Sequence, residues 1–178
     1  MEKEYDMLRA EIMQNLNLMH GLLSVLFTAV GLFFAFVFNN GDPKLFIIIF
    51  LVIVLIVNKI CSLNYSNIRI STYMIVYLEP NMENRKWETR NYRSINNSAK
   101  SKNIVFKVSI ADISYLLITA AVYIVFIVKL IENFNMLNLL IAGSINTFCL
   151  AYVLFISLNI SRDTNNRESF INMWKHID

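Results

Sequence analysis

Four long stretches of this chain are almost free of charged residues, and the charges crowd into the segments between them. A helix that crosses the hydrocarbon core of a bilayer needs about 20 consecutive apolar residues. In lipid, only helices and closed barrels satisfy their own backbone polar groups, and the alternating segments typical of a barrel are absent from the sequence. The pattern therefore predicts an all-α fold with four transmembrane helices, over residues 22–38, 45–63, 108–128 and 139–158.

Apolar residues also recur at helical spacing outside the four spans. In residues 1–20 they form a stripe that leads into the first span, made of Tyr5, Leu8, Ile12, Leu16 and Met19. A similar stripe follows the second span over residues 64–79 and ends at Pro80, which lacks a backbone donor and stops a helix. We expect residues 1–178 to form a single domain, in which all four helices extend beyond the membrane and together form a cytoplasmic four-helix bundle. Stripes that lie flat on the membrane surface are the alternative.

The basic residues indicate on which side of the membrane each connection lies. Of the 16 Lys and Arg residues, the two short connections hold Lys44 and Lys129. The other 14 (16 less two) fall in the tails, between the second and third spans or, for Lys59, near the end of the second span, from which a lysine can snorkel to the interface. Because Lys and Arg accumulate in cytoplasmic segments, we expect both termini in the cytoplasm, together with a loop over residues 80–103 and a tail over residues 159–178.

Composition limits the chemistry that the chain can perform. Charged residues make up 16% of it, against about 25% in an average soluble domain. The sequence has no phosphate-binding loop, nucleophile elbow or metal-binding histidine pair. His20, His176 and the two cysteines do not have the spacing of metal ligands. We therefore expect no enzymatic activity, no cofactor and no metal.

Polar residues within the spans are the candidates for lining a pore. The fourth span carries Ser144, Asn146 and Thr147, whose side chains face another helix or water when they lie in a membrane. Asp112 stands at the edge of the third span and His20 at the entry of the first, and ionisable groups at membrane depth are functional candidates. The alternatives are packing within one copy for the fourth span, a boundary position for Asp112 and an interfacial position for His20.

The central loop is basic and contains interleaved aromatic residues. Its candidates for contact with a partner or with lipid are Arg85, Lys86, Trp87, Arg90 and Arg93. Such a segment contacts a nucleotide, RNA or acidic lipid headgroups, or it does no more than fix the topology of the spans. We expect contact with lipid or with a partner protein and no direct binding of nucleic acid.

Two segments in the first half of the chain carry a resemblance. One is residues 4–12; the other runs from Arg69 to Tyr73, continues with Tyr77-Leu78-Glu79-Pro80 and ends with Trp87-Glu88. Both resemble segments of small four-span membrane proteins encoded beside prokaryotic anti-phage systems, among them the accessory membrane proteins of type VI-B CRISPR loci, which accompany an RNA-guided ribonuclease. The resemblance implies a bacterial inner-membrane effector that oligomerises and perturbs the membrane when infection is sensed.

The leading hypothesis is a homo-oligomeric pore, in contact with membrane lipids, that depolarises the inner membrane on infection. The alternative is a membrane-anchored adaptor that recruits or regulates a soluble defence protein, such as an RNA-guided nuclease, through its cytoplasmic loop. A small transporter is disfavoured because the spans lack buried charge pairs, broken helices and an internal repeat.

Overall fold

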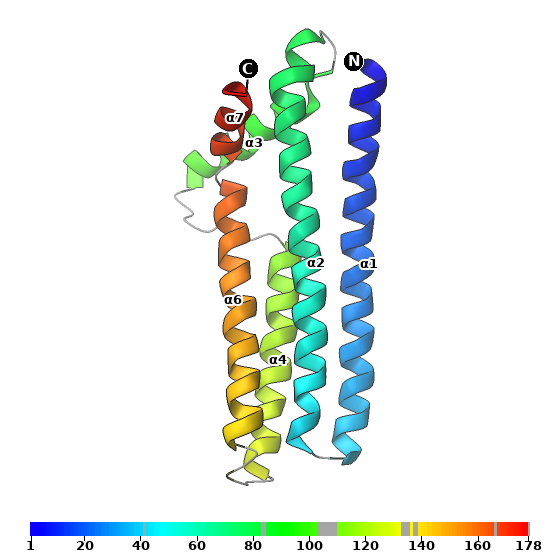
Figure 1. Cartoon of the computed structure of the whole chain (residues 1–178), viewed down its shortest axis with the longest axis vertical. Coiled ribbons are helices and arrows are strands. Elements are labelled where there is room, and N and C mark those ends of the chain that lie inside the picture. Colours follow the sequence, from blue (N-terminus) through cyan, green and yellow to red (C-terminus); the bar gives the residue numbers. More distant parts are fainter. Residues whose placement is uncertain are drawn as a thin grey trace. The chain divides into compact units, whose positions relative to one another are not determined.

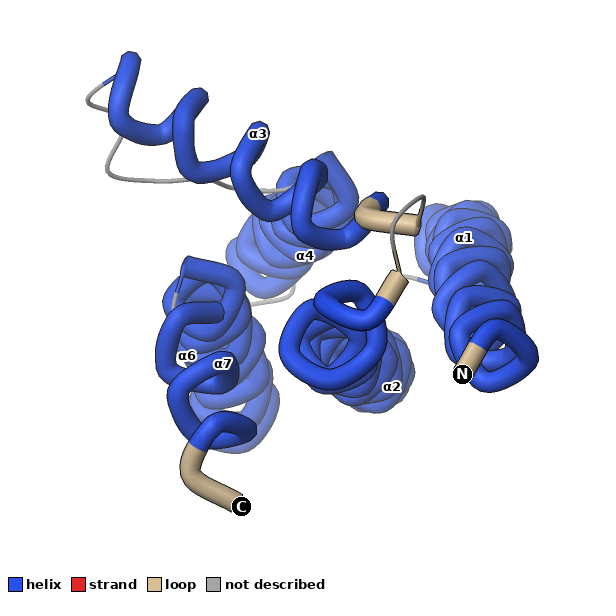
Figure 2. The backbone as a smooth tube through the Cα atoms, turned by 90° about the horizontal axis from the view of Figure 1, so that it is seen from above, coloured by secondary structure: helices blue, strands red, loops and turns tan. Residues whose placement is uncertain are grey.

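The computed structural model of the chain describes residues 1–40, 42–82, 85–102, 110–132, 136, 139–165 and 167–177. Every element of secondary structure within these residues is helical (Figure 1). Nearly all of the described backbone is drawn in the colour of helix in Figure 2. This confirms the all-α prediction. Four helical segments are long and apolar enough to span a membrane: Glu2–Phe38, Pro43–Asn81, Ser114–Glu132 and Leu140–Asn159. The four predicted spans lie in these four segments, except for the start of the third and Leu139.

The elements follow one another in a simple order. They are α1 (Glu2–Asn40), the 3₁₀ turn η1 (Pro43–Leu45), α2 (Phe46–Tyr73), the π-helix η2 (Met74–Leu78), the 3₁₀ turn η3 (Glu79–Asn81), α3 (Trp87–Lys102), α4 (Ile110–Glu132), the π-helix η4 (Leu139–Gly143), α6 (Ser144–Asn165) and α7 (Arg167–Lys175).

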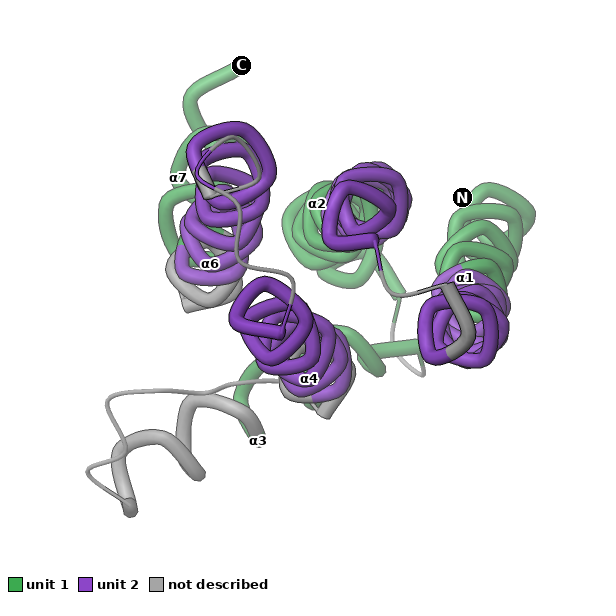
Figure 3. The backbone as a smooth tube through the Cα atoms, turned by 90° about the horizontal axis from the view of Figure 1, so that it is seen from below, with its two compact units in different colours: residues 1–18, 62–108, 159–178 green, residues 19–61, 109–158 purple. Residues whose placement is uncertain are grey.

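The chain divides into two compact units, coloured separately in Figure 3. The polar unit comprises Met1–Leu18, Ser62–Val108 and Asn159–Asp178, and the apolar unit comprises Met19–Cys61 and Ser109–Leu158. The boundary between the units falls inside α1, α2 and α6, so that all three helices contribute residues to both units.

The apolar unit has one hydrophobic core, to which α1, α2, α4 and α6 all contribute. Aromatic rings connect its helices: the ring centroids of Phe33 and Phe46 lie 5.1 Å apart, and those of Phe46 and Phe126 lie 5.5 Å apart. Such tilted and edge-on pairs stabilise beyond the area that they bury. The phenol of Tyr152 also donates a hydrogen bond to Oδ1 of Asn58 at 3.3 Å.

The four apolar segments cover one another only in part. In their most apolar windows, 17%, 39%, 33% and 28% of the residues are buried within the chain, in sequence order. A soluble protein rarely leaves so large a contiguous apolar surface in water. The helices are therefore compatible with a transmembrane protein, and the first span has the least cover from its own chain.

In the polar unit, the second long helix continues past the expected stop at Glu79. A proline ring clashes with the carbonyl four residues earlier, which for Pro80 is that of Val76. The backbone changes to the wider π form over Met74–Leu78 and then to a 3₁₀ turn that contains Pro80 and ends at Asn81. A π segment spaces its hydrogen-bonded residues further apart, which makes room for the ring.

The core of the polar unit joins the two apolar stripes predicted from the sequence. Tyr5 of α1 packs with Met74, Leu78 and Met82, and Leu8 and Ile12 pack against the same cluster. The C-terminal segment adds hydrogen bonds: the indole of Trp174 donates to the Thr72 hydroxyl at 3.1 Å, and the Tyr77 phenol donates to the Trp174 carbonyl at 2.5 Å.

A buried carboxylate organises the same unit. Glu79 is 1% exposed, and it accepts hydrogen bonds from the backbone N–H groups of Glu88 and Thr89, both at 2.8 Å. It also accepts a hydrogen bond from the Thr89 hydroxyl and another, at 3.3 Å, from the Tyr5 phenol. The first turn of a helix has backbone donors without partners in the helix, and it favours negative charge. Glu79 thus caps α3, which forms within the segment predicted as a loop.

We predict that Glu79→Gln destabilises the start of α3. The amide places its NH₂ group where a carboxylate oxygen now accepts hydrogen bonds, so at least one buried donor loses its partner at a cost of about 2 kcal/mol. Hydrogen exchange of the Glu88 and Thr89 amides in the detergent-solubilised protein measures this cost as exchange faster by about thirtyfold. Glu11→Gln, which changes an exposed carboxylate on α1, is the control. Equal exchange in the two variants would contradict the capping role.

Candidate functional site

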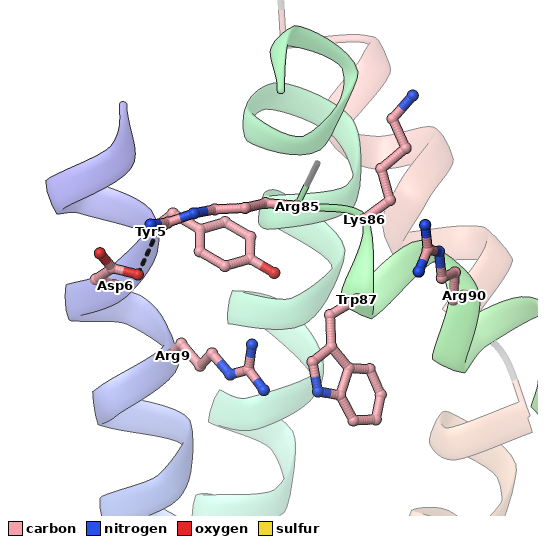
Figure 4. A pocket seen from close by; sticks show the side chains of 7 residues that line it. All are labelled: Tyr5, Asp6, Arg9, Arg85, Lys86, Trp87 and Arg90. Atoms are coloured by element: carbon pink, nitrogen blue, oxygen red, sulfur yellow. Dashed lines mark hydrogen bonds and ion pairs between the residues drawn. The ribbon is translucent and has the colours of Figure 1, made fainter. Parts of the chain in front are cut away.

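Four of the five loop candidates line one cavity of the polar unit. The cavity has a volume of about 360 Å³, and its lining comprises Tyr5, Asp6, Arg9, Arg85, Lys86, Trp87 and Arg90 (Figure 4). The first three belong to α1 and the other four to the start of α3 and the residues just before it. We call it the cationic cavity.

Helix periodicity and the Glu79 cap place these side chains together. Tyr5 and Arg9 are one turn apart on α1, and Trp87 and Arg90 are one turn apart on α3, so each pair lies on one face of its helix. Tyr5 donates to Glu79, and Glu79 fixes the first turn of α3. The buried carboxylate therefore holds both walls of the cavity.

The cavity carries an excess of positive charge. Its lining has four cations and one carboxylate, a formal excess of three. Arg85 forms an ion pair with Asp6 at 2.5 Å, and this contact raises the pKa of Arg85. Among the described residues, the cavity lining contains no ion pair other than this one. An anion that entered would meet Arg9, Lys86 and Arg90 in addition.

Two aromatic rings stand among these cations. The Arg9 guanidinium lies 5.6 Å from the centroid of the Trp87 ring, and the Arg85 guanidinium lies 5.8 Å from that of Tyr5. Both distances fall within the range of cation–π attraction. Tyr5 is buried, whereas Trp87 is 45% exposed and presents indole surface to solvent.

The fifth loop candidate, Arg93, lines a different cavity. This second cavity has a volume of about 540 Å³ and a largely apolar lining, and Lys86 borders both cavities. Arg93 shares the second cavity with Thr89 and Tyr92 of α3 and with Ile171 and Lys175 of α7. The five loop candidates therefore do not form one site.

Burial shifts the pKa values of two charged groups of the polar unit in opposite directions. Desolvation raises the pKa of Glu88, and the nearby Arg167 opposes that rise. Desolvation likewise lowers the pKa of Arg167, and Glu88 opposes that change. Among the described residues, Nε and Nη1 of Arg167 are buried without a hydrogen-bond partner. The attraction between Glu88 and Arg167 therefore favours the position of α7 beside α3 without a direct ion pair.

The pore candidates of the fourth span face in different directions. Asn146 is fully buried, and neither polar atom of its amide has a hydrogen-bond partner among the described residues. Ser144 and Thr147 are exposed on another face of α6. The Ser144 hydroxyl donates to the carbonyl of Leu140 in the preceding π-helix η4, and Thr147 shares a 3.1 Å hydrogen bond with the Tyr123 phenol.

The other two pore candidates lie on α4 and α1. Asp112 belongs to α4, but its side chain lies outside the part of the chain whose side chains are described. His20 is exposed on α1. Ser24 donates to the His20 carbonyl at 3.2 Å, and Thr28 donates to the Ser24 carbonyl at 3.0 Å, so the three residues lie one turn apart on the same side of the helix.

Two glycines complete this side of α1. Gly21, Ser24, Thr28 and Gly31 recur at alternating spacings of three and four, which keeps them on one face. A Cβ atom built on either glycine meets nothing within 4 Å. We call these four residues and His20 the small-residue stripe. Sequence reasoning found His20 and missed the others, although their spacing was visible in the sequence.

Comparison of the chain with protein-family models, with curated proteins and with solved structures found no match.

We predict that the Tyr5 phenol ionises at higher pH than the exposed tyrosines do. Burial, followed by the charge of Glu79, raises its pKa above the ordinary value of 10.0. A group whose pKa is raised in the folded state stabilises the fold below the unfolded-state pKa, and it loses that contribution as pH rises through the folded-state pKa. The stability of the polar unit should therefore fall above about pH 10.

The ultraviolet absorbance of tyrosinate measures this ionisation in a pH titration of the protein. The difference between the wild type and Tyr5→Phe isolates the signal of Tyr5, which should appear at a pH above the ordinary tyrosine pKa of 10.0. A Tyr5 signal that appears together with the signal of exposed tyrosines would contradict the buried hydrogen bond to Glu79.

Proposed function

We propose that this chain is a non-enzymatic bacterial inner-membrane protein and that several copies together form a pore that depolarises the membrane. In this proposal the apolar unit spans the bilayer and the polar unit extends the helices into the cytoplasm as a bundle, with both termini on that side. The biological setting is anti-phage defence. That setting rests on the resemblance of the first half of the chain, and the orientation rests on the distribution of Lys and Arg.

The small-residue stripe on α1 is the observation that carries the proposal. It lies on the span that has the least cover from its own chain, with 17% of its most apolar window buried. Glycine and serine let two helices in a membrane approach closely. Because both glycine positions are open in a single copy, the close approach that they permit is available to a helix of another copy.

The polar groups of the stripe support the same conclusion. The Ser24 and Thr28 hydroxyls donate to carbonyls of their own helix, which reduces the cost of placing them in lipid. The imidazole of His20 has a donor and an acceptor on opposite sides of its ring, and it is exposed. A polar group on a lipid-facing surface is unfavourable. Contact with a second copy or with water in a lumen removes that cost.

The exposed hydroxyls of the fourth span provide a second face for contact between copies. Ser144 and Thr147 border a groove of about 470 Å³ in the apolar unit, which Tyr123, Phe126 and Phe148 also line. A copy whose α1 and α6 both have exposed polar residues has two faces for neighbours. Rings of copies are built from two different faces on each copy.

We predict that Gly31→Leu abolishes assembly and ion flux. A Cβ atom at position 31 meets nothing within 4 Å in its own chain, and Gly31 is exposed, so we expect a single copy to keep its fold. The leucine side chain separates two helices that meet at the stripe. Light scattering in detergent should report a smaller particle, and liposomes that contain the variant should release potassium no faster than empty liposomes do.

Val25→Leu is the matched control, since it enlarges an exposed side chain of α1 that lies about 120° around the helix axis from Gly31. Its particle size and flux should equal those of the wild type. An unchanged particle size for Gly31→Leu would rule out the stripe as the contact between copies. In cells, a voltage-sensitive dye should show depolarisation upon infection with the wild type and Val25→Leu, and none with Gly31→Leu.

A second candidate function is that of a membrane-anchored adaptor for a soluble defence protein. The observation that favours it is the arrangement of Arg85, Lys86, Trp87 and Arg90 around one open cavity. We predict that Arg85→Glu combined with Lys86→Glu removes copurification of an RNA-guided nuclease and leaves liposome flux unchanged. Loss of flux together with retained copurification would favour the pore over the adaptor.

A further inference from the structure

We propose that the cationic cavity of the polar unit binds the phosphate groups of a nucleotide, with the base against Trp87. This binding site does not depend on the pore. Both walls of the cavity belong to the polar unit, and a single copy contains every residue that the proposal uses.

The charges of the cavity favour a compact ligand with several negative charges. Arg9, Lys86 and Arg90 line it in addition to the Arg85–Asp6 pair. Like charges held close together repel one another, and an anion between them removes that cost. Guanidinium groups match phosphate oxygens well, because their planar array of donors forms two parallel charge-assisted hydrogen bonds.

The volume of the cavity exceeds what a single phosphate group fills. About 360 Å³ lies at the lower end of the range for sites that hold small organic ligands. A ligand that fills the cavity and satisfies its cations therefore has an organic part attached to the phosphates. Figure 4 shows Trp87 beside Arg9 on the border of this space.

The exposed indole of Trp87 indicates the chemical nature of that organic part. A tryptophan that is 45% exposed in a basic cavity can stack with a planar ring, and stacking of a nucleic-acid base on an aromatic side chain contributes about 1–3 kcal/mol. The Arg9 guanidinium 5.6 Å from the centroid of the same ring strengthens such a stack because it is itself planar and cationic. A nucleotide supplies both the base and the phosphates.

A lipid headgroup shares the phosphate chemistry but matches the cavity less well. It has no planar ring for Trp87. The Asp6 carboxylate of the lining is 62% exposed, and its charge weakens the attraction of an anionic bilayer laid over the opening. A nucleotide enters the cavity and leaves Asp6 paired with Arg85.

The cavity is organised in advance of binding. Glu79 holds the first turn of α3 by two backbone hydrogen bonds of 2.8 Å and holds Tyr5 of α1 by a third of 3.3 Å. The backbone that carries Trp87 and Arg90 on one wall and Arg9 on the other therefore needs little ordering when a ligand arrives, which lowers the cost of binding.

The test uses the full chain in detergent micelles with Trp174→Phe as background. The chain has two tryptophans, so Trp87 is the remaining tryptophan and its fluorescence is excited selectively over that of tyrosine. The four ribonucleoside triphosphates are titrated one at a time, with adenosine, inorganic tripolyphosphate and phosphatidylglycerol vesicles as separate arms. We expect at least one triphosphate to quench Trp87 saturably and more tightly than tripolyphosphate does, with no saturation by adenosine.

Variants of the lining then assign the binding to the cavity. Arg9→Ala and Arg90→Ala should each weaken triphosphate binding by about tenfold, as expected for the loss of one charge-assisted contact. Arg93→Ala is the matched control, since Arg93 lies one turn further along α3 and borders the other cavity. If an alanine variant loses its helical circular dichroism, Arg9→Lys and Arg90→Lys replace it, and they should weaken binding because they lose the planar fork of donors.

Several outcomes would overturn the proposal. The absence of saturable quenching by all four triphosphates excludes a nucleotide site. Equal affinity for tripolyphosphate shows that the base makes no contact, and tighter binding to phosphatidylglycerol vesicles identifies lipid as the source of the phosphate. Tighter binding of an acidic defence protein, with no response to triphosphates, favours the adaptor. Liposome flux is not a readout of this test, so the pore proposal can fail separately.

Discussion

A single requirement underlies the polar unit: the buried carboxylate of Glu79 needs donors on every side. A charge removed from water is tolerated only where hydrogen bonds replace its hydration. Here the donors come from Tyr5, which is 74 residues away in the sequence, and from the first turn of α3. The carboxylate therefore joins the N-terminal helix, the end of the second long helix and α3. Both walls of the cationic cavity follow from that arrangement.

Sequence reasoning was successful where the physical signal is local. Hydropathy along the chain depends on consecutive residues, and it located the four helical segments that are long and apolar enough to span a membrane. The cap of α3 is not local. The residue directly before α3 is Lys86, a poor cap, and the capping carboxylate stands eight residues before the first residue of the helix. A loop was therefore predicted where the chain forms a helix. The π-helix before Pro80 was missed because a proline indicates a stop and not a change of helical form.

The candidate sites show the same division. Basic and aromatic residues clustered in the sequence identified one wall of the cationic cavity, whereas Tyr5, Asp6 and Arg9 of the other wall were missed because only the fold brings them near. Within one helix, composition was a weaker guide than spacing. Asn146 was grouped with Ser144 and Thr147 by its polarity, yet two positions along a helix turn a side chain far around the axis, and its amide is buried.

The helix α1 carries both proposed activities, and this places a condition on any link between them. Its residues 5, 6 and 9 border the cationic cavity, and its residues 20–31 contain the small-residue stripe. A ligand shifts an equilibrium only by the difference in its affinity for the two states. Nucleotide binding therefore regulates assembly only if association of copies changes the distance between Arg9 and α3. In that case assembly changes nucleotide affinity by the same factor, because coupling between two binding events is reciprocal.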